Sequence, residues 1–360
     1  MKKSAMKIAP KKKARPAAKA SLSFKAQAVM KRLLSAIPER ARDVLVKRYG
    51  LGAAAERLTL EAIGQTYSIT RERVRQIENH AINAIRKSDT YKKEKAAFDE
   101  LERLIHSLGK IIPEHELLAL AAKDDATQNH IHFMLVLGHP FTKSREDDEF
   151  IHHWYVDEGW AKRVKDALRK LYQGLPDDAL VPESEMVEMF LEHLRDVSEE
   201  YKNEEILRRW LSLSKRIGRN PLGEWGRAES SSVSLKGIRD YAYLVIRQHG
   251  SPMHFTEVAK RISELFEKEA HVATTHNELI KDERFVLVGR GLYALREWGY
   301  MTGVVKDVIR DVLKKGGPLT KEEVIDKVLK ERYVKPNTVV VNLQDTKHFK
   351  RLADGHYTLA

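Results

Sequence analysis

The 360-residue sequence predicts a mainly α-helical protein of several domains, with a helix-turn-helix near the N-terminus and tandem winged helices with small β-hairpins near the C-terminus. Three observations predict this class. Apolar residues recur at helical spacing along most of the chain, residues 58–87 have the turn pattern of a helix-turn-helix, and residues 236–360 contain an internal repeat. With 42% hydrophobic residues and no cysteine, the chain can fill roughly two to four packed domains without disulfides.

Positive charge is concentrated in the first quarter of the chain. Residues 1–95 contain 24 Lys and Arg against 8 Asp and Glu, a net charge of +16, whereas residues 96–360 have a net charge of −4. This asymmetry is typical of a protein that binds a polyanion, most often nucleic acid, although an anionic membrane would attract it too. Because no apolar run approaches the roughly 20 residues of a membrane helix, we expect no membrane segment and a cytoplasmic, nucleoid-associated location in a bacterium.

The first expected segment is a disordered basic arm at residues 1–23. Its first 20 residues contain eight Lys and Arg, no acidic residue, and two prolines among alanines. We expect the arm, with Lys11, Lys12 and Lys13 at its centre, to contact DNA phosphates. The alternative is a tail that only improves solubility.

Residues 24–95 are predicted to form several short helices, with one helix ending at Gly50 and Thr59 capping a later one, and these helices include the helix-turn-helix. Gly64 provides the small residue where its first helix meets the second, Ser68 lies in the tight turn, and Thr70 caps the second helix. The second helix should bury an apolar stripe and expose the opposite face. The stripe consists of Val74, Ile77, Ala81 and Ile85.

The exposed face of this helix carries side chains suited to DNA. Arg donates two hydrogen bonds to guanine, Gln pairs with adenine, and Glu accepts from cytosine. The alternative from the pattern alone is an exposed amphipathic helix with i,i+4 charge pairs. The expected base-reading residues are Arg71, Glu72, Gln76 and Asn79, and the expected phosphate-binding residues are Thr70, Arg73, Arg75, Arg86, Lys87, the three arm lysines and Arg290 of a later hairpin.

About residues 30–88, and above all the run Ile69-Thr70-Arg71-Glu72-Arg73-Val74-Arg75-Gln76-Ile77-Glu78, resemble region 4 of the primary bacterial sigma factors. The resemblance implies that Arg71, Glu72 and Gln76 read the upstream promoter element and that Arg73 and Arg75 clamp its backbone. It also implies docking on the flap of the RNA polymerase β subunit. Ser68 departs from the family, which commonly has Gly at this turn, and a non-Gly residue there can cost about 1 kcal/mol.

Residues 96–230 are predicted to be mostly helical, with their fold left open and further divergent winged helices as one interpretation. Aromatic and basic residues between Trp154 and Tyr172 could stack on single-stranded DNA, but their helical spacing favours burial. The histidines between His130 and His153 lack the spacing of a closed metal site. We therefore expect no metal, no cofactor, no small-molecule substrate and no enzymatic activity.

The C-terminal repeat predicts two winged helices, at residues 233–298 and 301–360. Each copy follows the order helix, turn, helix, helix, hairpin. In the first hairpin, Phe285, Leu287, Tyr293 and Leu295 should alternate onto one buried face about a Gly-Arg-Gly turn. Three of these residues, Phe285, Tyr293 and Leu295, recur 64 residues later as Phe349, Tyr357 and Leu359.

Lys236 to Trp298 resembles the HARE-type helix-turn-helix, a winged helix also found in the delta subunit of RNA polymerase and in chromatin and restriction proteins. The hairpin around Arg290 is the most specific part of this resemblance. In the second copy, Asp354 lies where the first hairpin turn is basic. We therefore expect the first copy to contact DNA, if either does, and the second to contact protein.

These features predict a DNA-binding transcription protein, a sigma-factor-like regulator or polymerase accessory factor acting at initiation. The expected partners are double-stranded promoter DNA and the RNA polymerase core. Two alternatives are a polymerase-bound adaptor that contacts mainly protein and the DNA-recognition component of a nuclease or restriction system. Because few aromatic residues precede the region-4-like segment, we do not expect the chain to open promoter DNA on its own.

Overall fold

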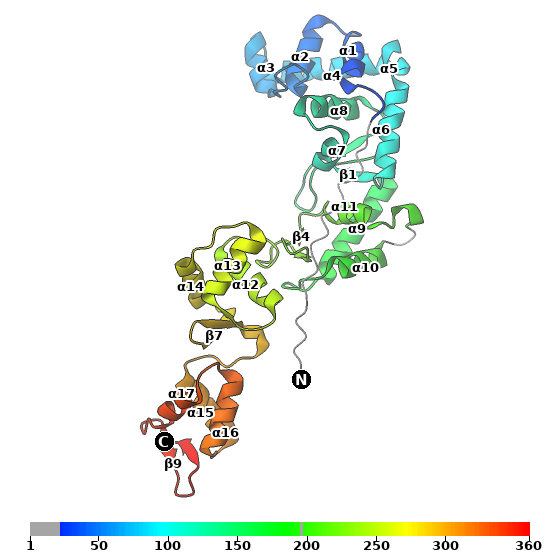
Figure 1. Cartoon of the computed structure of the whole chain (residues 1–360). Coiled ribbons are helices and arrows are strands. Elements are labelled where there is room, and N and C mark those ends of the chain that lie inside the picture. Colours follow the sequence, from blue (N-terminus) through cyan, green and yellow to red (C-terminus); the bar gives the residue numbers. More distant parts are fainter. Residues whose placement is uncertain (1–21, 195–196) are drawn as a thin grey trace. The chain divides into compact units, whose positions relative to one another are not determined.

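The computed structural model describes residues 22–194 and 197–360 (Figure 1). In this part the chain forms 17 α-helices and short antiparallel sheets, which confirms the predicted mainly α-helical class with small hairpins. The arm lysines Lys11, Lys12 and Lys13 lie outside the described residues. The chain divides into two compact units: the first runs to Leu175 and resumes at Glu183–Ile217, and the second contains Pro176–Pro182 and Gly218–Ala360.

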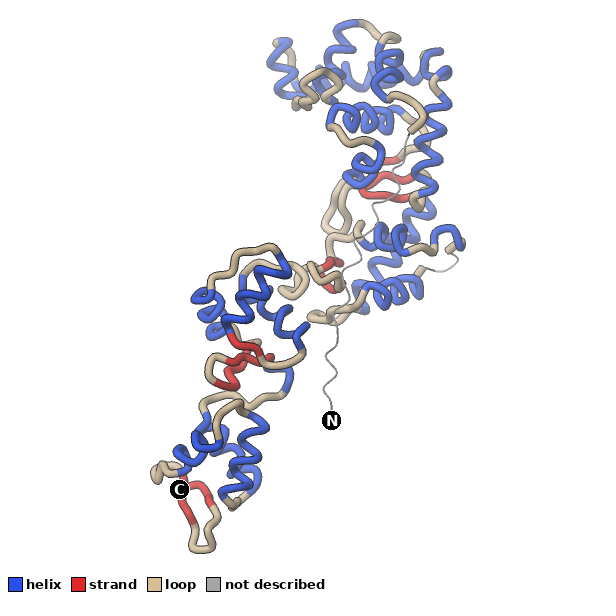
Figure 2. Tube along the Cα trace, in the orientation of Figure 1, coloured by secondary structure: helices blue, strands red, loops and turns tan. Residues whose placement is uncertain are grey.

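The first unit is almost entirely helical (Figure 2). None of the helices in the described residues of the chain is both long and apolar enough to cross a membrane. The helices of the first unit are α1 (Ala26–Leu34), α2 (Glu39–Tyr49), α3 (Leu60–Tyr67), α4 (Arg71–Lys87), α5 (Asp89–Lys93), α6 (Lys95–Ser107), α7 (Glu114–Ala121), α8 (Asp125–Leu137), α9 (Glu158–Gly174), α10 (Glu183–His193) and α11 (Glu204–Leu211), with a 3-10 turn at Glu199–Tyr201.

Local sequence sets several helix ends, as predicted. The hydroxyls of Thr59 and Thr70 accept hydrogen bonds from N–H groups in the first turns of α3 and α4, at 3.1 and 3.2 Å. Helix α2 ends at Gly50, which has a φ of 64°. A Cβ atom at this glycine would lie 2.6 Å from the carbonyl oxygen of Ala55, so the close approach of the following loop also requires glycine.

A three-stranded antiparallel sheet interrupts these helices. Strands β1 (Ile111–Pro113) and β2 (Thr142–Ser144) pair with the two edges of β3 (His153–Tyr155). Trp154 of β3 is 2% exposed, and Trp160 of α9 is 8% exposed. Both indoles therefore belong to the core, which agrees with burial rather than with a stacking platform for single-stranded DNA.

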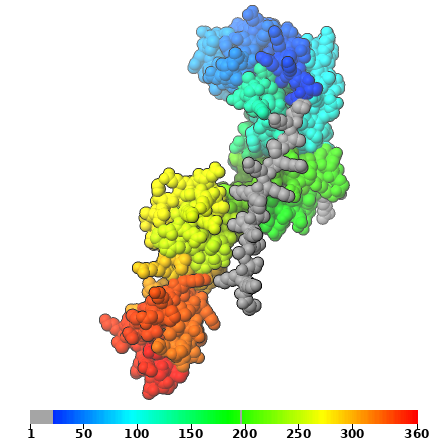
Figure 3. Space-filling model, in the orientation of Figure 1, coloured from blue at the N-terminus to red at the C-terminus, as the bar shows by residue number. Residues whose placement is uncertain are grey.

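One hydrophobic core joins the predicted helix-turn-helix region to helices after residue 95. Leu45 and Ile85, from before the expected boundary, belong to the same buried cluster as Leu101 and Phe133, from after it. Helix α8 contacts α1, α2 and α4, and in the space-filling view the blue, cyan and blue-green residues of this part form a continuous body (Figure 3). The helical region expected at 24–95 thus continues into the middle region, because α8 covers apolar faces of the earlier helices.

The second unit contains the repeat, preceded by the small sheet of β4 (Ile217–Arg219) and β5 (Trp225–Arg227). Each copy has three helices and a closing hairpin in the predicted order, and each has its own apolar core. The first copy consists of α12 (Ile238–His249), β6 (Met253–His254), α13 (Phe255–Phe266), α14 (Val272–Lys281), β7 (Phe285–Gly289), β8 (Leu292–Leu295) and a 3-10 turn at Arg296–Trp298. The second consists of α15 (Val305–Gly316), α16 (Lys321–Glu331), α17 (Pro336–Leu343), β9 (Phe349–Arg351) and β10 (Tyr357–Leu359).

The first hairpin differs from its prediction at one residue. Leu287 pairs with Tyr293 as the alternation requires, but its side chain is 49% exposed. Phe285, Tyr293 and Leu295 are buried as predicted, and the opposite face of the hairpin is buried as well, with Val286, Val288 and Ala294 forming a second small cluster. This face is covered because segments after the hairpin pack on it, which alternation within the hairpin could not indicate.

Candidate nucleic-acid interface

The turn between α3 and α4 has the close packing that the sequence predicted. A Cβ atom on Gly64 would lie 2.6 Å from the carbonyl oxygen of Ile69, so only glycine fits at the crossing of the two helices. The N–H of Ile69 donates to the Gly64 carbonyl at 3.0 Å. Ser68 adopts a left-handed conformation with a φ of 52°, the conformation in which the related family commonly has Gly.

Helix α4 is seated through its apolar stripe and one buried carboxylate. Val74, Ala81 and Ile85 are buried as predicted. Glu78, which the sequence analysis did not include in the stripe, is 8% exposed and accepts a hydrogen bond from the Tyr49 hydroxyl at 2.8 Å. Burial and the nearby Glu78 carboxylate raise the pKa of Tyr49, so the phenol remains a hydrogen-bond donor. The sequence signal for the burial of Glu78 was its position four residues after Val74, which puts the two residues on the same face of the helix.

The opposite face of α4 presents the predicted reading residues to solvent. Arg71, Glu72, Gln76 and Asn79 are all exposed. The structure thus brings these four side chains together on one helix face, the arrangement that base reading in a major groove requires.

Intrahelical pairs order part of this face in the absence of DNA. Two guanidinium nitrogens of Arg75, Nε and Nη2, donate to the Glu72 carboxylate at 2.8 and 2.7 Å, and this hydrogen bonding lowers the pKa of Glu72. Arg73 donates to Oε1 of Gln76 at 3.1 Å. The pairs have i,i+3 spacing and both members of the Glu72–Arg75 pair are more than half exposed, so they contribute little to stability and can open on contact with DNA.

Arg86 does not lie among the phosphate-facing residues, where the sequence prediction placed it. Its Nε donates to the Leu137 carbonyl at 3.0 Å and its Nη2 donates to the Val136 carbonyl at 2.8 Å. The guanidinium therefore caps the C-terminal end of α8, whose last carbonyls have no partner within the helix. The adjacent Lys87 is exposed and forms no ion pair with any residue that the structure describes.

Helix α8 also holds the loop that leads into the helix-turn-helix. The Asn129 amide is buried and donates to the carbonyls of Gly50 and Ala55 at 3.0 and 2.8 Å. Its Oδ1 accepts from Nε of Arg57 at 2.7 Å. One side chain from the middle region thus fixes the loop that connects α2 to α3 at its first residue, Gly50, and near its middle, at Ala55, a contact that no local sequence pattern indicated.

Three histidines of the middle region, His130, His132 and His153, are buried, whereas His139 and His152 are exposed. Nδ1 of His130 lies 2.6 Å from the Ala126 carbonyl, and burial lowers the pKa of His153 to about 4, which keeps it neutral. Among the residues that the structure describes, no group of three His, Cys, Asp or Glu side chains is placed to hold a metal ion.

Comparison with known proteins matches the segment that contains this interface. Residues 33–87 match the family described as sigma-70, region 4. The chain is 46% identical over 57 residues to RNA polymerase sigma factor SigA of Nostoc sp., which covers 16% of this chain and 14% of that protein. It is 50% identical over 54 residues to sigma factor SigA1 of Synechococcus elongatus, covering 15% of this chain and 13% of that protein.

A second similarity involves another kind of transcription protein. The chain is 26% identical over 86 residues to the probable DNA-directed RNA polymerase subunit delta of Lactococcus lactis subsp. cremoris, covering 22% of this chain and 46% of that protein. The chain thus spans less than half the length of each of these relatives. These similarities support a transcription-related role, and the HARE-type assignment of the repeat stays a prediction.

The two cations at the end of α4 provide a test of this geometry. Arg86→Ala should lower the free energy of unfolding by about 2 kcal/mol, because charge-assisted hydrogen bonds to buried carbonyls are lost, while the salt dependence of DNA binding stays unchanged. Lys87→Ala should do the reverse, with unchanged stability and a slope of log affinity against log salt that is shallower by about 0.9. Chemical denaturation and fluorescence anisotropy measure the two quantities.

Arg86→Lys is the matched control. It keeps the charge but cannot reproduce the two-carbonyl geometry, so its stability should resemble that of the alanine variant. The cap would be excluded if Arg86→Ala made the salt slope shallower and Arg86→Lys restored it, since a phosphate ligand needs only the charge.

Proposed function

We propose that the chain is a sequence-specific DNA-binding protein that regulates transcription initiation together with RNA polymerase, as a sigma-factor-like regulator or a polymerase accessory factor. One observation carries the proposal: α4 buries one face against its own module and exposes Arg71, Glu72, Gln76 and Asn79 on the other. The named relatives, which are sigma factors and delta subunits of RNA polymerase, support it. Its site of action would be the nucleoid of a bacterial cytoplasm.

In this function α4 enters the major groove of promoter DNA by its N-terminal half. Arg71 and Gln76 would meet base edges, and Glu72 would accept from a cytosine amino group after its pair with Arg75 opens. Arg75, once released, would join Thr70, Arg73 and Lys87 at phosphates. When the Glu72–Arg75 pair opens, Glu72 would therefore gain a base as its partner and Arg75 would gain a phosphate. The action is equilibrium binding, with no bond made or broken and no cofactor.

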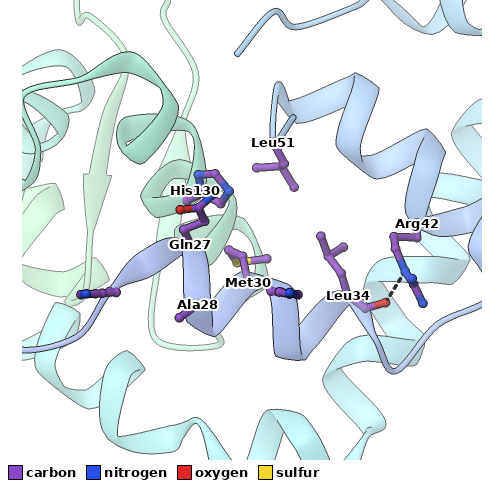
Figure 4. Close-up of a pocket in the computed structure, with 9 residues that line it drawn as sticks. Gln27, Ala28, Met30, Leu34, Arg42, Leu51 and His130 are labelled. Atoms are coloured by element: carbon purple, nitrogen blue, oxygen red, sulfur yellow. Dashed lines mark hydrogen bonds between the residues drawn. The ribbon is translucent and has the colours of Figure 1, made fainter. Parts of the chain in front are cut away.

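The polymerase core is the proposed protein partner, with the flap of its β subunit as the docking element by resemblance. A cavity of about 530 Å³ lies at α1 and α2, with Met30, Leu34 and Leu51 at its base (Figure 4). Its rim is basic, with Lys31 and Arg42, and the Arg42 guanidinium donates to the Leu34 carbonyl at 3.0 Å. An apolar side chain with acidic neighbours would fit here. Since α8 covers other apolar surface of α1 and α2, the cavity is the place left for such a partner.

Base reading predicts loss of sequence preference at defined positions. Arg71→Ala and Gln76→Ala should each weaken binding to a preferred site by about 1 to 3 kcal/mol and relax the preference at one or two base pairs, because each removes a base-edge contact. Arg73→Ala is the control, since a phosphate contact should weaken all sequences alike. Selection of sites from random DNA measures the preference, and one identical motif for wild type and both reader variants would refute the assignment.

The outcome of the same selection separates the two alternative roles. A polymerase-bound adaptor would co-purify with RNA polymerase core while returning no motif. A recognition component of a nuclease system would return a motif and give metal-dependent DNA cleavage with its partner. Co-purification of polymerase together with a motif supports the proposed function.

Promoter opening provides a further prediction. Strand separation needs preferential stabilisation of unpaired bases, whereas Trp154 and Trp160 are core residues with exposed fractions of 2% and 8%. Added to polymerase core as the sole specificity factor, the 360-residue chain should leave promoter thymines unreactive to permanganate, and it should alter opening only when a complete sigma factor is present. Strong thymine reactivity with core enzyme and this chain alone would contradict the proposal.

A further inference from the structure

The two copies of the repeat differ in how their cations are used. In the first copy most arginines are paired, as Arg284 is with Asp240 and Asp282 at 2.9 and 2.6 Å and Arg296 is with Glu283 at 3.9 Å. Lys236, Lys281 and Arg290 are the exposed cations of this copy that form neither an ion pair nor a ring contact with any described residue. In the second copy most exposed cations form no ion pair with any described residue. These are Lys314, Lys315, Lys321, Lys327, Lys330, Lys335, Lys347, Lys350 and Arg351.

The loop that leads into the third helix has opposite charge in the two copies. In the first copy it contains Glu267 and Glu269, and its one lysine, Lys268, lies over the Tyr241 ring at 4.9 Å. In the second copy the loop contains no acidic residue, and Lys335 at the N-terminus of α17 is exposed. The third helix of each copy is the second helix of its helix-turn-helix, which approaches DNA by its N-terminal residues. The loop before this helix therefore repels phosphate in the first copy and attracts it in the second.

Helix α17 presents uncharged side chains that suit base edges. Asn337 and Thr338, in its first turn, are exposed, and Val341, one turn later, is 57% exposed. Asn can pair with adenine, Thr can bond to either kind of base, and an aliphatic side chain can contact the thymine methyl group. The equivalent turn of α14 exposes Val272, which is 44% exposed, together with Ala273 and Thr274, so the two turns share a threonine and differ in Asn337.

The hairpins also differ in accessibility. In the first copy the outer edge of β7 is taken, since the N–H of Tyr333 donates to the Val288 carbonyl at 2.7 Å. In the second copy Lys350 and Arg351 are exposed on β9. The acidic residue of this hairpin, Asp354, lies 3.1 Å from His356, which offsets part of its charge when the histidine is protonated.

We propose that the second winged helix, not the first, is a further binding surface for duplex DNA. Lys335, Lys347, Lys350 and Arg351 would contact phosphates on both sides of α17, and Asn337 and Thr338 would face base edges. This reverses the expectation from Asp354 that the second copy contacts protein, because its single carboxylate is outweighed by Lys350 and Arg351 of the same hairpin, which form no ion pair with any described residue. The first copy, with an acidic loop before α14 and an occupied strand edge, would hold the second copy without contacting DNA itself.

The salt dependence of DNA binding by the full chain tests this proposal. On a duplex without a preferred site, Lys350→Ala/Arg351→Ala should make the slope of log affinity against log salt shallower by about 1.8, at about 0.9 for each lost phosphate contact. Lys260→Ala/Arg261→Ala, which removes two cations of the first copy that both pair with Glu264, is the matched control and should leave the slope unchanged. Lys335→Ala/Lys347→Ala is a second variant that should reproduce the change, and thermal melting verifies that each variant is folded.

The outcomes separate this surface from the α4 interface. Arg71→Ala and Gln76→Ala, made in the same chain, should change sequence preference but not the slope altered by the second-copy variants. An unchanged slope in both second-copy variants would overturn the proposal, as would an equal effect of Lys260→Ala/Arg261→Ala. Loss of polymerase co-purification with an unchanged slope would show that the surface binds protein instead.

Discussion

The attachment of α8 to the helix-turn-helix is the contact on which the rest of the first unit depends. The buried Asn129 amide donates to the carbonyls of Gly50 and Ala55 and accepts from Arg57, while Arg86 at the end of α4 caps α8 in return. A buried carbonyl left without a partner costs about 1 to 3 kcal/mol, so these bonds specify one geometry more strongly than apolar packing alone. The α2–α3 loop and the C-terminal end of α4 are thereby fixed to the same helix.

This constraint explains why the recognition surface can be precise although its own side chains are exposed. The reading face of α4 is held only by weak i,i+3 pairs, and precision must come from the position of the helix itself. That position is set by Val74 and Ile85 in the core, by the Tyr49–Glu78 hydrogen bond, and by α8. In the proposed function the middle region would support DNA recognition by holding α4 in place. The similarity to sigma-70 region 4, which covers residues 33–87, includes only part of the folded module.

The sequence predicted the features that depend on neighbouring residues. The caps at Thr59 and Thr70, the end of α2 at Gly50, the requirement for Gly64 and the order of elements in the repeat all follow from local chemistry or periodicity. It did not predict features whose partners are distant in the chain. Arg86 looked like a phosphate ligand because its carbonyl partners lie about 50 residues later, at Val136 and Leu137. Leu287 looked buried because it alternates onto the same face as Phe285, and alternation cannot reveal that tertiary packing leaves this one position of the face exposed.

The role of α8 can be measured directly by hydrogen exchange in the full chain. Asn129→Ala removes the bonds to Gly50 and Ala55, and Gln128→Ala, which removes a single bond from the same helix to the Ala122 carbonyl, is the control. If α8 holds the recognition module, Asn129→Ala should accelerate amide exchange through the α2–α3 loop and into α3 and α4, and DNA affinity should fall although no DNA-facing side chain has changed. Faster exchange confined to α8 itself, with α3, α4 and DNA affinity as in the control, would contradict the account.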